Sequence, residues 1–225
     1  MESEEPQPPP DIKLTSMDES GNMDRHISTV TYENSSTHQS QHKECINNVK
    51  GATKHNTIRF MMDGLQDLGC NVSFMSKKIS CEPCVEHLAG AFDTERKEIV
   101  LCENNIPEVI EKSGKTVDEV YGKLVQEYLV YAYDSARVHF DPQNPQHVAC
   151  SYIRAINLTK VEELCGYGRA SPSDLREGKK MCVARYASWA MAQSLKLSED
   201  QAGRLVNSVI DSCYNDYAPY PHIPS

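Results

Sequence analysis

The residues best suited to chemistry are four cysteines in the first half of the chain, Cys70, Cys81, Cys84 and Cys102, spaced as C-x10-C-x2-C-x17-C. A CxxC pair lets two sulfurs chelate one tetrahedral Zn²⁺, and two distant cysteines can complete a structural site. The same spacing allows two disulfides that join a helix to a hairpin, which is the alternative we favour over zinc or unpaired thiols. The chain has nine cysteines, so a complete pairing is impossible.

A second candidate group contains His139, Asp141 and His147, which surround a predicted turn between two helices. Imidazole and carboxylate groups are zinc ligands, so three of them on one side of a turn would form a weak alternative metal site. A solvated or hydrogen-bonded turn is the simpler interpretation, and we favour it.

The composition indicates one acidic domain. The chain has 225 residues, a formal net charge of -9 and a pI of about 5.4. This charge argues against a nucleic-acid-binding surface. No segment approaches the roughly 20 consecutive apolar residues that span a bilayer, so we expect no transmembrane segment and only peripheral membrane contact.

The first 56 residues differ in composition from the rest. They begin with the acidic, proline-rich segment MESEEPQPPPD, and they contain few Leu, Ile, Val or Phe residues and no regular periodicity. Such a segment buries too little apolar surface to fold, so we predict a disordered acidic and polar tail over 1–56. No N-terminal targeting signal is visible. The folded domain is predicted to cover 57–225.

Periodicity predicts an α+β domain that is mostly helical, with a small cysteine-rich β-hairpin. The hairpin consists of LAGAFD and EIVLC, joined by the polar TERK. An S-x-x-Q capping box at Ser198 marks the start of the last helix. The expected helices cover 57–69, 117 to shortly before Asp141 (the longest), 145–158, 181–195 and the segment from 198.

Six separated blocks resemble one known protein family. They are SCEPC at 80–84, GAFD at 90–93, IVLCENNI at 99–106, AYDSAR at 132–137, HVACSYIRAINL at 147–158 and CYNDYAPYPHIP at 213–224. In this order they resemble the mitochondrial inner-membrane metalloproteases that mature and assemble an ATP synthase subunit, whose human member is also described as a Ku-antigen-binding protein. The likeness covers about three quarters of the chain.

This resemblance implies a zincin-like, metalloprotease-like domain with paired cysteines, facing the intermembrane space and held peripherally at the inner membrane. It also implies zinc as the family's cofactor and a protein client, such as an ATP synthase subunit. The family's chemistry sits on a helix with the motif H-E-x-x-H, where two histidines hold Zn²⁺ and the glutamate activates the bound water.

The chain contains no H-E-x-x-H. Alignment on the A-Y-D of AYDSAR puts Glu127 at the first histidine position, Tyr128 at the glutamate and Tyr131 at the second histidine. A shift by one residue keeps a glutamate but places Gln126 and Val130 at the ligand positions. Neither alignment supplies a zinc site.

On the following helix, the family usually has an acidic residue after Cys-Ser as a third ligand. This chain has Tyr152 there. With both imidazoles and the base missing, nothing remains to bind the ion or to accept the proton of water. The rings of Tyr128, Tyr131 and Tyr152 can instead fill the emptied pocket.

We therefore interpret the chain as a catalytically inactive pseudoprotease with a binding or chaperone-like role, and we predict no cofactor. One alternative is an active metalloendopeptidase with non-standard ligands, taken from Glu127, His139, Asp141 and His147. Another is an adaptor protein of the cytosol or nucleus, consistent with the lack of a visible targeting signal.

Overall fold

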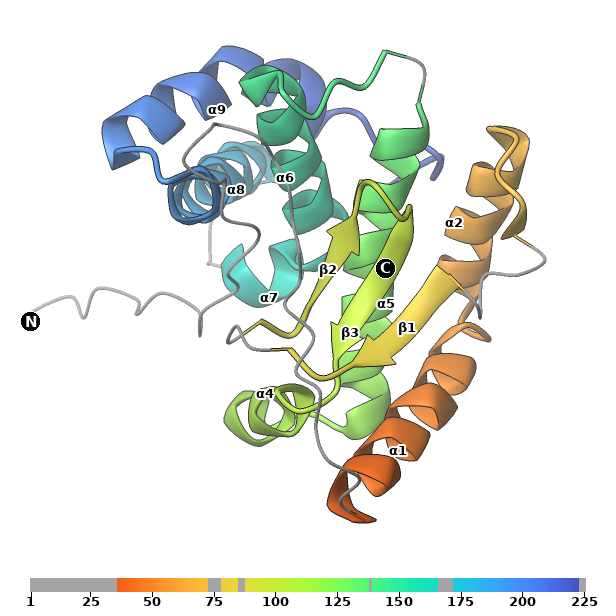
Figure 1. The fold of residues 1–225 in the computed structure, drawn as a ribbon. Helices are drawn as coiled ribbons and strands as arrows, with labels where there is room; N and C mark the ends of the chain where they lie inside the picture. Colours follow the sequence, from red (N-terminus) through yellow and green to blue (C-terminus); the bar gives the residue numbers. More distant parts are fainter. Residues whose placement is uncertain (1–35, 73–77, 85–87, 138, 166–171, 223–225) are drawn as a thin grey trace, which may run out of the picture.

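The computed structural model describes residues 36–72, 78–84, 88–137, 139–165 and 172–222. It confirms an α+β fold that is mostly helical, with one small sheet (Figure 1). The elements in chain order are α1 (Ser36–Ala52), α2 (Asn56–Asp67), β1 (Ile79–Glu82), β2 (Gly90–Asp93), β3 (Glu98–Cys102), α4 (Ile106–Ser113), α5 (Val117–Ala136), α6 (Pro145–Thr159), α7 (Val161–Cys165), α8 (Pro172–Leu195) and α9 (Glu199–Tyr214).

The sheet contains the predicted hairpin and one further strand. Strand β2 pairs antiparallel with β3, with Ala91 opposite Val100. In the turn between them, Asp93 Oδ1 accepts hydrogen bonds from the amides of Glu95 and Arg96. Strand β1 pairs parallel with the other side of β3. Sequence analysis did not find β1, because the four residues ISCE include two polar side chains and lack the apolar run that marks the hairpin.

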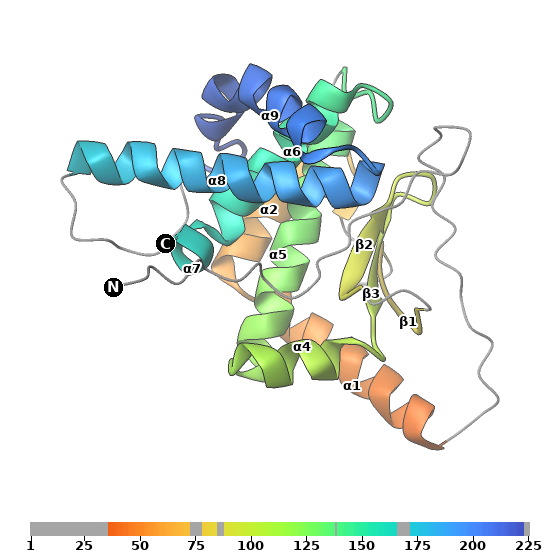
Figure 2. The same ribbon diagram turned by 90° about the vertical axis from the view of Figure 1, so that its left-hand side faces the viewer.

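Helix α5 is the centre of the fold. It contacts β2 and β3 as well as α1, α2 and α6, and Figure 2 shows it upright beside the sheet. Its first turn carries a capping box between Thr116 and Glu119, which supports the predicted start of this helix. The expectation that it is the longest helix is wrong. Helix α8 has 24 residues against 20 in α5, and its polar first half gave no apolar period.

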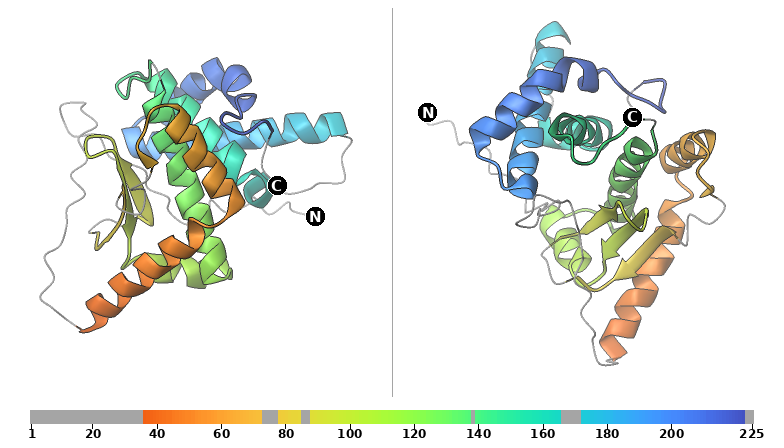
Figure 3. Two further views of the ribbon diagram at one scale, coloured as in Figure 1. Left: turned by 90° about the vertical axis from the view of Figure 1, so that its right-hand side faces the viewer. Right: turned by 45° about the horizontal axis from the view of Figure 1, so that its top comes forward.

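Helices α6, α8 and α9 pack against one another on the other side of the molecule from α1 (Figure 3). The predicted helices over 145–158 and 181–195 are confirmed within α6 and α8, and α9 begins at the expected Ser198–Gln201 capping box. Within the described ranges, none of the helices has the length and apolar content needed to cross a membrane.

Part of the segment that was predicted to be a disordered tail forms helix α1. Residues 36–52 are helical, and the inward side chains Cys45, Val49 and Ala52 are buried where α1 meets β1 and α5. Two of these three are cysteine and alanine rather than large aliphatic residues, so the sequence carried little signal. The folded domain includes residues 36–56, and the predicted disordered segment 1–35 lies outside the described residues.

Disulfides connect several of these elements, which confirms that the cysteines pair. Each of two bonds joins two neighbouring helices, one ties α1 to the sheet, and one lies beside β3. The pairs are Cys45–Cys81, Cys84–Cys102, Cys150–Cys213 and Cys165–Cys182, and Cys70 is a free thiol.

Arg154 on α6 ties the C-terminal segment to α5. Its side chain is 0% exposed, and Nε donates to the Asp134 carboxylate at 2.9 Å. Nη1 lies 2.6 Å from a carboxylate oxygen of Asp216, and Nη2 donates to the carbonyl oxygen of Ala218. Ser151 donates to the second oxygen of Asp134 at 2.6 Å. The blocks AYDSAR, HVACSYIRAINL and CYNDYAPYPHIP therefore meet at one buried charge.

The two carboxylates of this network differ electrostatically. Burial raises the pKa of Asp134, and Arg154 and Ser151 oppose this rise. Burial also acts to raise the pKa of Asp216, but the hydrogen bond from Arg137 and the charge of Arg154 outweigh it, so the pKa of Asp216 is lowered. The arginine partners therefore stabilise the charged form of Asp216 by more than burial destabilises it.

The bond between α1 and β1 has a testable effect on stability. The double substitution Cys45→Ala/Cys81→Ala opens a link across 36 residues of sequence. We expect the free energy of unfolding to fall by about 3–4 kcal/mol, because the unfolded chain gains freedom. Urea denaturation without reductant measures this change. Cys70→Ala, which removes the free thiol, is the control and should change stability by less than about 1 kcal/mol. Equal stability of the double variant and wild type would contradict the docking of α1.

Arg154→Met leaves Asp134 and Asp216 without their buried cation. We expect a loss of about 3–5 kcal/mol in the free energy of unfolding, measured by thermal or urea denaturation. The exposed Arg185 on α8 provides a matched control, and Arg185→Met should cost less than about 1 kcal/mol. Adding Asp134→Asn to Arg154→Met should recover part of the loss. Strict additivity of these two substitutions would show that the pair is not coupled.

Candidate functional site

The positions aligned with the catalytic motif lie on the inward side of α5. Glu127 and Tyr128 are almost fully buried, and Tyr131 is half-buried. Glu127 and Tyr131 are four residues apart, so they lie on the same face of the helix. Any chemistry at these positions has to take place in the interior between α5 and its neighbours.

Three tyrosines pack together there. The ring of Tyr131 lies 6.2 Å from that of Tyr128 and 5.8 Å from that of Tyr152 on α6, measured between ring centroids. The second pair is edge-to-face, and both separations fall in the range that favours aromatic contact. The residues that align with the base, the second ligand and the third ligand are therefore in contact through aromatic rings.

Tyr128 also links α5 to the edge strand β2. Its hydroxyl donates a hydrogen bond to the carbonyl oxygen of Gly90 at 2.8 Å. A Cβ atom at position 90 would lie 2.9 Å from Cε2 of Tyr128 and 2.6 Å from the carbonyl oxygen of Val100. Only glycine allows this close approach. Tyr128 thus has a structural role where the alignment places the general base.

Glu127 is neutralised by a lysine. Its Oε2 atom lies 2.7 Å from Nζ of Lys160, just after α6, and both side chains are largely buried. A buried carboxylate requires a close partner of opposite charge. Here an ammonium group provides the positive charge at the first ligand position.

These residues do not fit a zinc ion. Phenol oxygens hold their protons up to a pH near 10 and are weak ligands when neutral, and the carboxylate of Glu127 is already paired with Lys160. The alignment shifted by one residue fits no better. Val130 is a buried aliphatic residue, and Gln126 Nε2 lies 3.5 Å from the hydroxyl of Tyr220.

The group at 139–147 is a hydrogen-bonded turn. The amide of Asp141 donates to Nδ1 of His147 at 3.0 Å, which engages one ring nitrogen. His139 is exposed, and with His147 it lines a cavity of about 240 Å³ that also contains Arg137 and Arg154. Both guanidinium groups are paired with the carboxylates of Asp134 and Asp216. The structure brings the two histidines to one cavity but does not arrange the three residues as a metal-ligand cluster.

Three of the four cysteines in the alternative zinc site form disulfides, so their sulfurs are not thiolate ligands. Cys81 is bonded to Cys45, and Cys84 is bonded to Cys102. Cys70, which we expected to belong to this cluster, is the free thiol. The sequence could not reveal the partner of Cys81, because Cys45 lay in the segment predicted to be a tail.

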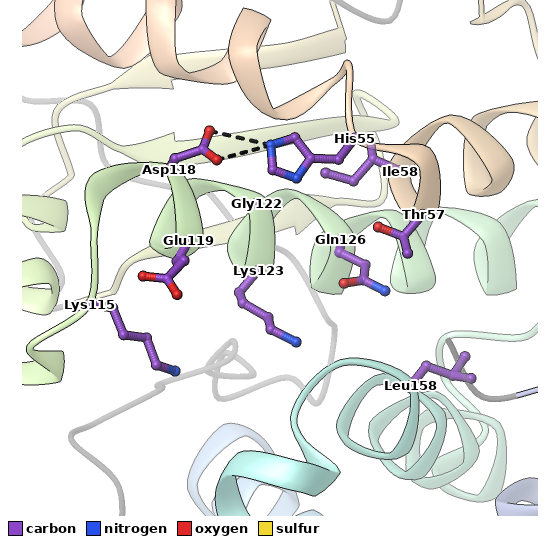
Figure 4. Close-up of a pocket in the computed structure, with 10 residues that line it drawn as sticks. All are labelled: His55, Thr57, Ile58, Lys115, Asp118, Glu119, Gly122, Lys123, Gln126 and Leu158. Atoms are coloured by element: carbon purple, nitrogen blue, oxygen red, sulfur yellow. Dashed lines mark hydrogen bonds and ion pairs between the residues drawn. The ribbon is translucent and has the colours of Figure 1, made fainter. Parts of the chain in front are cut away.

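A second cavity of about 240 Å³ lies beside α5, near the start of α2 (Figure 4). Gln126 faces this cavity and Tyr128 faces the sheet, a rotation of roughly 200° about the helix axis. At one edge, Nε2 of His55 pairs with the Asp118 carboxylate at 3.2 Å. The lining residues, which mix both signs of charge, are His55, Thr57, Ile58, Lys115, Asp118, Glu119, Gly122, Lys123, Gln126 and Leu158. Sequence analysis missed this cavity because charged residues three or four positions apart on a helix are typical of a solvent-exposed face.

Lys160 is the residue of the site that sequence analysis did not single out. It follows α6 and is separated from Glu127 by more than thirty positions, so no local pattern connects them. One indirect signal existed, since a glutamate on the apolar face of a predicted helix requires a cation nearby.

Comparison with known proteins identifies relatives. The Peptidase M76 family matches residues 26–221. The mitochondrial inner membrane protease ATP23 homolog of Xenopus laevis is 31% identical over 167 residues, which is 74% of this chain and 67% of the relative. The homologs of Danio rerio and Homo sapiens are 32% and 30% identical, each over 74% of this chain and over 62% and 64% of their own lengths.

The chain spans about two thirds of the length of these curated relatives. No solved structure matches it. The family match covers the region from before α1 to the C-terminal segment, including the Arg154 network and the tyrosine cluster. The chain is a member of the Peptidase M76 family.

Proposed function

We propose that this chain is a catalytically inactive relative of the M76 proteases that acts by binding a protein client. The observation that carries the proposal is the contact of Tyr131 with Tyr128 and Tyr152, at the three positions aligned with a base and two metal ligands. Aromatic rings occupy the volume, and Lys160 supplies the positive charge, so the site is closed to the chemistry of the family.

Peptide hydrolysis by a zincin requires a metal ion and a base that accepts the proton of water. Tyr128 cannot serve as that base near neutral pH, since a tyrosine hydroxyl ordinarily ionises near pH 10, and its proton is donated to Gly90. Glu127 is held by Lys160. What this region retains is a packed interior between α5, α6 and β2, which keeps the fold together without the catalytic groups.

The proposed location is the inner membrane of mitochondria, on the intermembrane-space side. The relatives are named mitochondrial inner membrane proteases. Four disulfides suit an oxidising compartment and argue against an adaptor protein of the cytosol or nucleus. Attachment would be peripheral. The family resemblance points to an ATP synthase subunit as the client, bound in a chaperone-like role.

The first prediction concerns catalysis. The purified 225-residue chain with added Zn²⁺ should show no chelator-sensitive cleavage of unfolded protein substrates, because the motif positions on α5 carry neither histidine ligands nor the glutamate base. The Xenopus laevis relative, which is named a protease, serves as the positive control in the same assay. Chelator-sensitive cleavage by this chain would refute the proposal. If His147→Ala then abolished that cleavage, the active enzyme with non-standard ligands would be the correct alternative.

The second prediction restores the metal site. A variant with Glu127→His, Tyr128→Glu, Tyr131→His, Tyr152→Glu and Lys160→Met should take up one more equivalent of zinc than wild type, measured by elemental analysis. The matched control keeps Lys160. It should bind this additional ion at least about tenfold more weakly, because an ammonium group stands beside the metal position. Circular dichroism checks that both variants fold. A folded variant that gains no zinc would show that the alignment of the motif onto 127–131 is wrong.

A further inference from the structure

The Cys45–Cys81 disulfide lies beside a buried carboxylate. The sulfur atoms of both cysteines and a carboxylate oxygen of Glu103 all lie within 4.8 Å of one another. The three residues come from α1, from β1 and from the position directly after β3, and all three are buried. Within the ranges that the structure describes, no other disulfide belongs to such a group of potential metal ligands. This disulfide therefore differs from the others in what surrounds it.

One oxygen of Glu103 is available to a cation. The side chain is 1% exposed, and its Oε2 atom lies 2.8 Å from Nδ1 of His42. The Oε1 atom is buried and accepts no hydrogen bond, with Nε2 of His38 at 3.3 Å. Carboxylates that bind a metal are commonly oriented by a hydrogen bond from a neighbouring group. His42 provides that orientation, and Oε1 is left to bind an ion.

Reduction turns the two sulfurs into metal ligands. A thiol reductant transfers two electrons to the Cys45–Cys81 bond, so two thiols form and the reductant becomes a disulfide. Zn²⁺ then displaces one proton from each thiol, because the thiolate is the form that binds a metal. Two protons are released, and the oxidation state of zinc does not change.

The spacing of the two cysteines suits a zinc ion. Two sulfurs on one tetrahedral zinc lie about 3.8 Å apart, since each Zn–S bond is about 2.3 Å long. The Cα atoms of Cys45 and Cys81 are 6.1 Å apart, so rotation about the Cα–Cβ bonds brings the sulfurs to this separation without moving the backbone. Glu103 supplies an oxygen as the third ligand, and water completes the tetrahedron.

The charge of the group favours the bound ion. Two buried thiolates beside Glu103 would repel one another, whereas Zn²⁺ with two thiolates is neutral. The buried charge then remains that of the carboxylate alone, which His42 already contacts. Helix α1 also packs on α5 and buries Val49 and Ala52, so its position does not depend on the disulfide alone.

We propose that Cys45, Cys81 and Glu103 bind one Zn²⁺ ion when the Cys45–Cys81 disulfide is reduced, and release it when the disulfide forms. The contact between α1 and the sheet is then linked by a metal under reducing conditions and by a covalent bond under oxidising conditions. The site shares no residue with the motif positions on α5, so it is independent of the proposed function.

The test compares the 225-residue chain before and after reduction with a phosphine. Zinc binding is measured by competition with a chromophoric chelator. The reduced protein should bind one equivalent more than the oxidised protein. Cys45→Ser/Cys81→Ser should lose this equivalent. Glu103→Gln, which keeps the size of the side chain and removes its charge, should bind it at least about tenfold more weakly, since even groups that only orient a ligand contribute 10–100-fold to metal affinity.

Cys165→Ser/Cys182→Ser is the matched control, because it removes another disulfide that has no such carboxylate beside it among the described residues. This variant should keep the additional equivalent. The proposal is overturned if oxidised and reduced wild type bind the same amount of zinc, or if Glu103→Gln binds as wild type does. Loss of the ion in Cys84→Ser/Cys102→Ser would also overturn it, in favour of a four-thiolate site.

Two further readouts report on the ligands and the fold. Cobalt in place of zinc should give thiolate-to-metal absorption bands in reduced wild type, and these should vanish in Cys45→Ser/Cys81→Ser. Zinc should raise the melting temperature of the reduced wild type, followed by circular dichroism, but not that of reduced Glu103→Gln. Cobalt bands that persist without Cys45 and Cys81, or a reduced chain that has no helical signal even with zinc, would contradict the proposal.

Discussion

A guanidinium group without solvent contact is the constraint on which the helical part of this protein depends. Arg154 on α6 has to be met by acceptors, and the chain provides them from α5 and from the segment after α9. These hydrogen bonds form together only when α5, α6 and the segment after α9 are packed as they are here. This network involves none of the motif positions on α5.

Under the proposed function, the motif region is a case in which a fold persists while its chemistry changes. A metal site contributes charge and occupies volume, and both must be replaced for the interior to remain packed. In this chain, aromatic rings take the volume and the Glu127–Lys160 pair balances the charge. Gly90, in the block GAFD, leaves the space that the ring of Tyr128 occupies beside the sheet.

The sequence predicted what local periodicity and capping encode. The helix over α5, the start of α9 at Ser198 and the β2–β3 hairpin were foreseen, and aligned blocks located the tyrosines. Helix α1 was missed because a cysteine and an alanine complete its buried face and a covalent bond supplements apolar burial. The partnership of Glu127 with Lys160 was also missed, because it exists only after α5 and α6 pack together.

The bond between Cys45 and Cys81 gives the N-terminal helix two covalent routes to the rest of the molecule. One is the main chain through the turn at 53–55, and the other is the disulfide. A protease that nicks the turn would leave α1 attached, and a reductant alone would leave the peptide chain intact. Release of α1 would require both events, so limited proteolysis under oxidising conditions would yield a nicked protein that separates into fragments only when reductant is added.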